Sequence, residues 1–161
     1  MNIFVLDRNY KKAAEYHCDK HVVKMIVETA QMLCTVKHLN DMNAYYKATH
    51  VNHPCTKWVA QSIQNYAWLN DLGIALCLEY NKRYNKIHKS HDVILDCFFN
   101  PPKLSNSGLS EFICAMPDDC KISKDPVINY REYYLKYKSK FAKWKYTKIP
   151  DWYSLNINQY A

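Results

Sequence analysis

The spacing of apolar residues along the chain predicts a mostly helical fold. Residues 10–36 and 56–85 carry apolar side chains three and four positions apart, which is the period of one helix face. A bend is expected at Gly73 in the second segment. A last helix is predicted over residues 125–141, and a short extended apolar segment over residues 2–6. The core is therefore expected to be compact and built on two long helices.

Between the predicted helices, residues 99–126 hold four of the six prolines and show little periodicity, so we expect a long ordered loop there. The 161 residues, 48% of them hydrophobic, suffice for one domain spanning residues 1–161. Charges interrupt every apolar run before the roughly 18 residues of a membrane span, and the start resembles no secretory signal. We expect a cytoplasmic protein that binds no membrane, located in the host cell cytoplasm if a phage encodes it.

Composition narrows the possible chemistry. Only two glycines, Gly73 and Gly108, are present, which excludes dinucleotide-binding and Walker loops. Seven cysteines form no CxxC pair, so we expect reduced and mostly buried thiols. The formal net charge of +7 favours a polyanionic or nucleotide partner. No feature indicates a homo-oligomer.

One face of the first long helix carries the candidate chemistry. On a helical wheel, six polar residues share one arc while the other faces are apolar: His17, His21, Lys24, Glu28, Gln31 and Thr35. If this stripe lines a pocket, Glu28, His21 and Lys24 converge on a substrate for general acid–base work or stabilisation of a cationic transition state. Alternatively, the stripe is a solvated face on which Lys24 and Glu28 form an ordinary i,i+4 pair.

The same helix carries residues that suit two other types of site, a metal site and a Cys–His hydrolase site. His17 and His21 have the i,i+4 spacing of metal ligands, and His50 and His53 offer further imidazoles. However, Cys18 stands where a zincin motif needs glutamate, so no metal and no other cofactor is predicted. A Cys–His hydrolase is disfavoured because Cys18 points away from both histidines on a helix, as a buried structural thiol would.

The segment over residues 130–146 interleaves lysines with aromatic rings that can stack on bases. It is the best nucleic-acid-like patch in the sequence. The alternative is an amphipathic helix whose rings pack inward and whose lysines are solvated.

The start of the chain resembles a known family. Residues 2–6 and 18–28 are similar to the opening of the phage-type pyrimidine-dimer DNA glycosylases of the endonuclease V type. In that family an Asp-x-His segment on a helix precedes the catalytic glutamate, which lies seven positions after the histidine. Asp19, His21 and Glu28 reproduce this spacing. The resemblance implies that Glu28 is the essential carboxylate and His21 the pocket histidine.

Further segments extend the likeness. Residues 53–84 are similar to the family's second long helix, and residues 150–153 with the terminal Tyr160-Ala161 to its aromatic tail. Uncharacterised tailed-phage proteins carry a similar His-x-Asp-Lys-His-Val-Val-Lys-Met segment. The chain is thus similar to a divergent member of the superfamily.

Two departures from the family pattern change the expected activity. The family's nucleophile is the N-terminal amine of a small residue exposed by removal of methionine, whereas Asn2 is usually too large for that processing. Covalent imine chemistry and strand cleavage are therefore not expected. Val27 and Gln31 occupy the places of the family's DNA-gripping arginines, which predicts weaker DNA bending and damage recognition.

The sequence predicts an N-glycosidase of phage origin that hydrolyses the base–sugar bond of a nucleotide. Glu28 stabilises the oxocarbenium-like state or activates water, His21 or His17 protonates the departing base, and Lys24 neutralises a phosphate. The substrate is a free nucleotide, such as a cyclic nucleotide immune signal that a phage degrades to evade host defence. The alternatives are a DNA glycosylase acting on a flipped damaged or modified base, and a non-catalytic nucleotide- or DNA-binding protein.

Additional side chains are expected to bind the substrate beside Lys24. They are Gln31, Arg8, His53, Lys57, Asn65 and Arg83.

Overall fold

The computed structural model describes residues 1–160, and within them the fold is all-helical with no strand. The α-helices are α1 (Tyr10–Tyr16), α2 (Asp19–Leu39), α3 (Pro54–Ala60), α4 (Ile63–Tyr84), α5 (His91–Phe99), α6 (Pro126–Tyr133) and α7 (Asp151–Ser154). Short 3-10 turns cover Asp118–Cys120 and Ile157–Tyr160, and a π-helical turn, η2, covers Tyr134–Lys138. The predicted fold class, a mostly helical chain built on two long helices, is confirmed.

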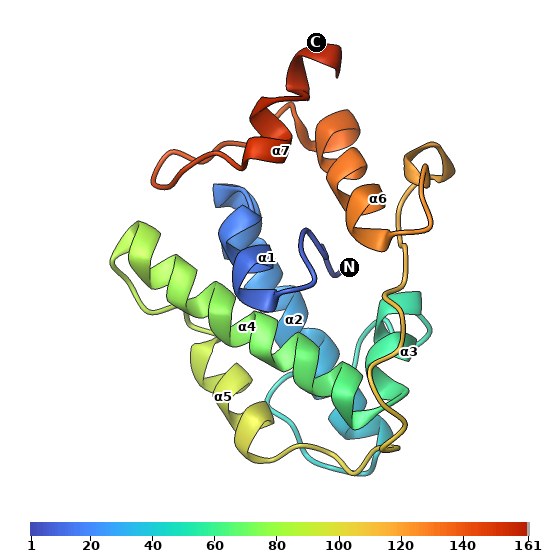
Figure 1. The fold of residues 1–161 in the computed structure, drawn as a ribbon. Coiled ribbons are helices and arrows are strands. Elements are labelled where there is room, and N and C mark those ends of the chain that lie inside the picture. Colours follow the sequence, from blue (N-terminus) through green and yellow to red (C-terminus); the bar gives the residue numbers. More distant parts are fainter. Residues whose placement is uncertain (161) are drawn as a thin grey trace.

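The long helices α2 and α4 pack against each other and form the centre of the molecule (Figure 1). Helix α4 runs without interruption through Gly73, the residue at which a bend is expected from the sequence. A Cβ atom at Gly73 would lie 2.9 Å from Thr29 Cγ2 on α2 and 3.1 Å from Ile94 Cδ1 on α5. The glycine is therefore needed for the close approach of three helices.

The first predicted helix is divided in two by a tertiary contact. After α1 ends at Tyr16, His17 and Cys18 are extended, and α2 begins at Asp19. The guanidinium of Arg83, on α4, donates to the carbonyl of His17 at 2.7 Å and to that of Glu15 at 2.9 Å. Because a distant side chain satisfies carbonyls at the break, apolar spacing along the chain does not reveal it.

The second predicted helix is likewise divided, at Gln61 and Ser62. Ser62 caps α4 by accepting a hydrogen bond from the backbone N–H of Asn65 at 3.0 Å. The capped start turns α4 away from α3, so that α4 packs on α2.

Helix α5 was not predicted, because nine residues are too few for a clear period and Phe98 and Phe99 on its exposed side obscure the pattern. The last predicted helix ends earlier than expected: α6 stops at Tyr133 and continues only as η2, short of residue 141.

The N-terminal segment, residues 2–6, is buried without regular secondary structure and packs against α2, α3 and α6. It has no strand partner, so side chains bind its backbone. Arg131 on α6, for example, donates to the carbonyl of Leu6 at 2.9 Å. Burial of this segment brings the start of the chain into the centre of the fold.

The predicted ordered loop is present between α5 and α6 and runs along one side of the molecule (Figure 1). It is tied to the body by the N–H of Ile63, which donates to the carbonyl of Ser105 at 2.9 Å. Phe112 packs on the ring of Trp68 with centroids 4.6 Å apart.

All seven cysteines are free thiols, and six of them are buried. None of the helices described in residues 1–160 has both the length and the hydropathy of a membrane span.

We predict that Gly73→Ala lowers the free energy of unfolding by about 1 kcal/mol. Overpacking costs about 1–3 kcal/mol, and the higher helix propensity of alanine offsets roughly 1 kcal/mol of that. Urea unfolding measures the change. In a Thr29→Ser background, which removes Cγ2, the same substitution should cost less. A Gly73→Ala variant as stable as the wild type would contradict this account.

Candidate active site

The α-amino group of Met1 contacts the carboxylate of Glu28, with 3.0 Å between the nitrogen and Oε1. Glu28 lies in the middle of α2, and its side chain is only 11% exposed. An amine next to a carboxylate can act as a nucleophile once its proton has moved. From the sequence this chemistry is not expected, because Asn2 is usually too large for removal of methionine. In the structure the amine of Met1 itself occupies the position.

Asn2 fixes the backbone next to this amine. Its amide nitrogen donates to the carbonyl of Ala115 at 2.7 Å, and its Oδ1 accepts from the N–H of Ile3 at 2.7 Å. The thiol of Cys55 on α3 donates to the same oxygen at 3.6 Å, and Tyr130 Oη on α6 lies 3.3 Å from it. Sequence reasoning missed this role of Asn2, because its partners come from three distant segments.

One oxygen of Glu28 has no hydrogen-bond partner within residues 1–160. Oε2 is buried and makes no hydrogen bond within the described residues. The ammonium of Lys24 lies 3.8 Å away, and its side chain is 65% exposed. The predicted proximity of Lys24 to Glu28 is therefore formed, and Lys24 reaches from solvent toward the carboxylate.

His53 lies within the electrostatic influence of the same pair. Burial lowers the pKa of its ring, the charges of the N-terminal amine and His50 lower it further, and Glu28 opposes them. His53 caps α3, where its Nδ1 accepts from the N–H of Cys55 at 3.1 Å. With Nδ1 as acceptor, the proton of the neutral ring is on Nε2. The free Nε2–H of His53 is therefore a donor whose ring feels the charges of the N-terminal amine and Glu28.

His21 and His17 do not reach Glu28. His21 is 3% exposed, its ring packs on Phe4 with centroids 4.5 Å apart, and its Nδ1 is 2.5 Å from the hydroxyl of Tyr134. His17 is 0% exposed and donates from Nδ1 to the carbonyl of Ala13 at 2.6 Å. Seven residues of helix separate His21 from Glu28 by about 10 Å. The convergence of His21 and Glu28 that the wheel predicted is absent.

Burial also removes the charge of both rings. It lowers the pKa of His17 to about 4, and the positive charge of Arg83 acts in the same direction. It lowers the pKa of His21 to about 2, with further lowering by His17, Lys138, Lys24 and Lys20. Both histidines are neutral parts of an aromatic core at neutral pH.

Two of the predicted binding residues have structural contacts instead. Asn65 is buried, donates to the carbonyl of Trp58 at 2.8 Å and accepts from the N–H of Ser110 at 3.0 Å. Arg83 is buried and pairs with Asp19 at 3.1 Å as well as with the α1 carbonyls. The structure thus binds both side chains to protein partners rather than presenting them to a substrate.

The remaining predicted residues are not brought together. Arg8 is exposed and pairs with Glu111 at 3.1 Å and Asp125 at 3.2 Å, away from α2. Gln31 is half-buried one turn beyond Glu28, and Lys57 is exposed on α3. The latter two lie on the elements that flank the amine, without contacts that define a role.

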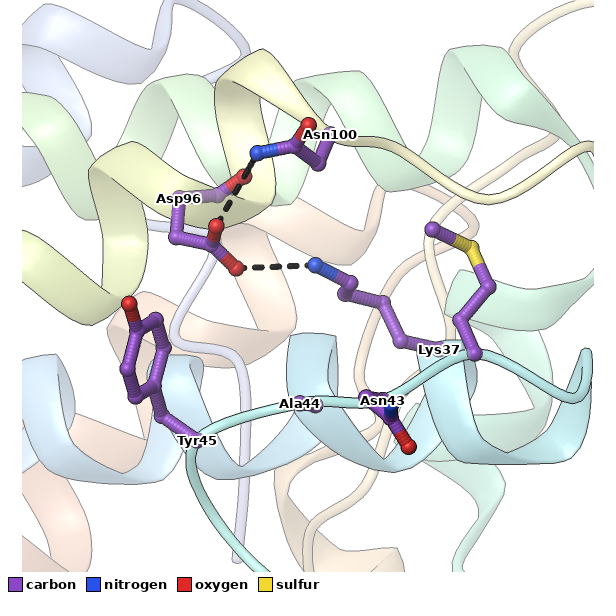
Figure 2. Close-up of a pocket in the computed structure, with 7 residues that line it drawn as sticks. Lys37, Asn43, Ala44, Tyr45, Asp96 and Asn100 are labelled. Carbon is purple, nitrogen blue, oxygen red and sulfur yellow. Dashed lines mark hydrogen bonds and ion pairs between the residues drawn. The ribbon is translucent and has the colours of Figure 1, made fainter.

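A separate cavity of about 370 Å³ lies where the end of α2 meets α5 (Figure 2). Its centre is an ion pair, 2.8 Å long, between Lys37, which is 2% exposed, and Asp96. Asn100 donates to the same carboxylate at 3.0 Å. Lys37 lies nine residues after Glu28, half a turn around the helix. None of the predicted site residues lines this cavity.

Within residues 1–160, no group of three His, Cys, Asp or Glu side chains has the geometry to hold a metal ion. The rings of His17 and His21 are 6.4 Å apart, and those of His50 and His53 are 6.5 Å apart. Cys18 is fully buried, and burial raises its pKa.

A contact between an amine and a carboxylate can support nucleophilic chemistry. Comparison with protein families identifies the class of protein: residues 1–92 match the pyrimidine dimer DNA glycosylase family. Because the match covers more than half of the 161 residues, the chain belongs to this family of DNA glycosylases. Neither the curated proteins nor the solved structures contain a match.

We predict that stability falls as the pH falls from about 6.5 toward 4. Both histidines have folded-state pKa values below that of an unfolded chain, so the unfolded state binds more protons in this window. Each ring contributes a slope of about 1.4 kcal/mol per pH unit. Urea unfolding at several pH values should show a shallower slope for His21→Phe and the wild-type slope for His50→Gln, at an exposed ring. Equal slopes in all three proteins would contradict burial of neutral histidine.

Proposed function

We propose that this protein is a DNA N-glycosylase in which Glu28 and the amine of Met1 act on the same base–sugar bond. The 3.0 Å contact between the two groups carries the proposal. Family membership supplies the class of substrate, a nucleotide within DNA. The target base is damaged or modified and is flipped out of the stack to reach a protein site.

The contact suits a nucleophilic mechanism. Transfer of a proton from the ammonium of Met1 to Glu28 frees the nitrogen lone pair. The nitrogen then bonds to C1′ of the sugar while the bond from C1′ to the base breaks, and the base leaves with the electron pair. Opening of the sugar ring places the electron pair of the C1′–O4′ bond on O4′, which takes a proton, and leaves an imine between Met1 and C1′. Water hydrolyses the imine and restores the amine.

Glu28 also stabilises the charge that develops during base departure. An oxocarbenium-like sugar is cationic, and the hydrogen-bond-free Oε2 of Glu28 provides a negative charge for it. The Nε2 proton of His53 is suited to stabilise the departing base, a role the sequence analysis assigned to His21 or His17. This assignment rests on the electrostatic influence of the N-terminal amine and Glu28 on the ring and on its partial exposure, since His53 is half-buried.

A free nucleotide is the second candidate substrate, for example a cyclic nucleotide immune signal that a phage-encoded enzyme destroys. The observation that favours it is that two neighbours of Glu28 on α2 carry no charge. Val27 and Gln31 flank the carboxylate, and Lys24 is the one cation with a side-chain contact to it among the described residues. A small nucleotide needs fewer phosphate contacts than a duplex.

We expect Glu28→Gln to reduce release of free base at least about 100-fold, because the variant loses both the proton acceptor and the negative charge. The assay uses ultraviolet-treated DNA, DNA with modified bases, cyclic di- and trinucleotides and NAD, with chromatography of the released base. Glu111→Gln, at an exposed surface carboxylate, is the matched control. Absence of free base from every substrate, or an equal loss in the control, would overturn the proposal. A nucleotide that binds and is recovered intact would indicate a non-catalytic binding protein.

We also expect borohydride to trap a covalent adduct between the wild-type protein and the cleaved substrate, because the reagent reduces an imine to a stable amine. Intact-mass measurement identifies the adduct and confirms that Met1 is the first residue. A protein with a short Gly-Ser extension before Met1 should show neither adduct nor base release. Full base release by the extended protein would show that water, activated by Glu28, is the nucleophile.

A further inference from the structure

Three lysines from two distant segments lie at the start of α2. An aromatic cluster of Phe4, His21, Tyr133 and Phe141 packs there. Lys20 and Lys24 lie one turn apart on α2, and Lys138 lies in η2. The ring of Phe141 has the ammonium of Lys20 at 4.9 Å and that of Lys138 at 5.9 Å from its centroid. Lys138 is also 4.6 Å from the ring of Tyr133. Cation–π contacts therefore hold two ammonium groups at one ring.

The lysines are not balanced by nearby carboxylates. Neither Lys20 nor Lys138 has a carboxylate oxygen within 4.0 Å in the described part of the chain, and Lys24 has only Glu28, at 3.8 Å. The acidic neighbour of Lys20, Asp19, is already engaged by Arg83 at 3.1 Å and by the N–H of Lys145 at 2.7 Å. Like charges at i,i+4 are unfavourable on an isolated helix. An anionic ligand would relieve this repulsion.

The arrangement leads directly to the candidate active site. Lys20, Lys24 and Glu28 follow one another at i,i+4 spacing, so they form a single row with a rise of about 6 Å between neighbours. All three lysines lower the pKa of the buried His21 beneath them, which places their charges over the same part of α2. Lys138, in η2, lies beside the row, because it contacts the same Phe141 ring as Lys20.

We propose that Lys20, Lys24 and Lys138 bind the backbone phosphates of the DNA strand next to the nucleotide held at Glu28. The proposal rests on the DNA glycosylase function and names how the same site holds its substrate. Lys138 and Phe141 belong to the basic–aromatic segment of residues 130–146, so this part of that segment packs on the start of α2 rather than forming a separate patch. Ammonium groups contact phosphate without reading sequence, and the row positions the strand.

The test measures binding of an undamaged duplex oligonucleotide by fluorescence anisotropy at several salt concentrations. The triple variant Lys20→Gln/Lys24→Gln/Lys138→Gln should flatten the slope of log K against log salt by about 2 to 3, since each lost phosphate contact removes roughly 0.9. The matched control is Lys47→Gln/Lys86→Gln/Lys103→Gln, which changes the net charge equally at exposed sites. An unchanged slope in the first variant, or equal flattening in both, overturns the proposal.

A second arm uses a cyclic dinucleotide as the ligand. If the lysine row binds a DNA strand, the triple variant should weaken duplex binding much more than dinucleotide binding, and the reverse result overturns the proposal. Circular dichroism and urea unfolding establish that the variant is folded. Because undamaged DNA releases no base, this test is independent of the base-release assay. Failure of the lysine row and failure of the glycosylase function are therefore distinguishable.

Discussion

The contact between the Met1 amine and Glu28 depends on burial of the first residues of the chain. A buried segment without regular secondary structure leaves backbone donors and acceptors to be satisfied individually. Asn2 and Arg131 do this through bonds to the loop and to the N-terminal backbone. The helices are arranged around this segment, and the position of the amine follows from its immobilisation.

The two parts of the chain, residues 1–92 and the residues after them, contribute differently to the site. Residues 1–92 contain Met1, Glu28, Lys24 and His53, which are the groups in or near the contact. Residues after 92 provide the surroundings: Ala115 accepts from Asn2, and Tyr134 packs against His21. The second part of the chain therefore immobilises groups that the first part supplies.

At the start of α2, the lysines lie on the exposed side and the buried histidines are neutral. His17 and His21 are buried and neutral because desolvation disfavours imidazolium. Lys20 and Lys24 lie on the exposed edge of the same helix turns. The +7 charge of the chain, which suggests an anionic partner, is thus concentrated in part beside the candidate carboxylate, and a neutral core supports it from below.

The sequence by itself determined the helical class, the two long helices and the place of Glu28 on the first of them, since helical period and the seven-residue spacing after His21 are local properties. It did not determine the breaks at residues 17–18 and 61–62 or the burial of His21. Only the tertiary structure brought Met1 to Glu28, 27 positions away, and Asn2 to Ala115. Such contacts depend on how distant segments fold back on one another, and no local pattern of apolar and polar residues records that.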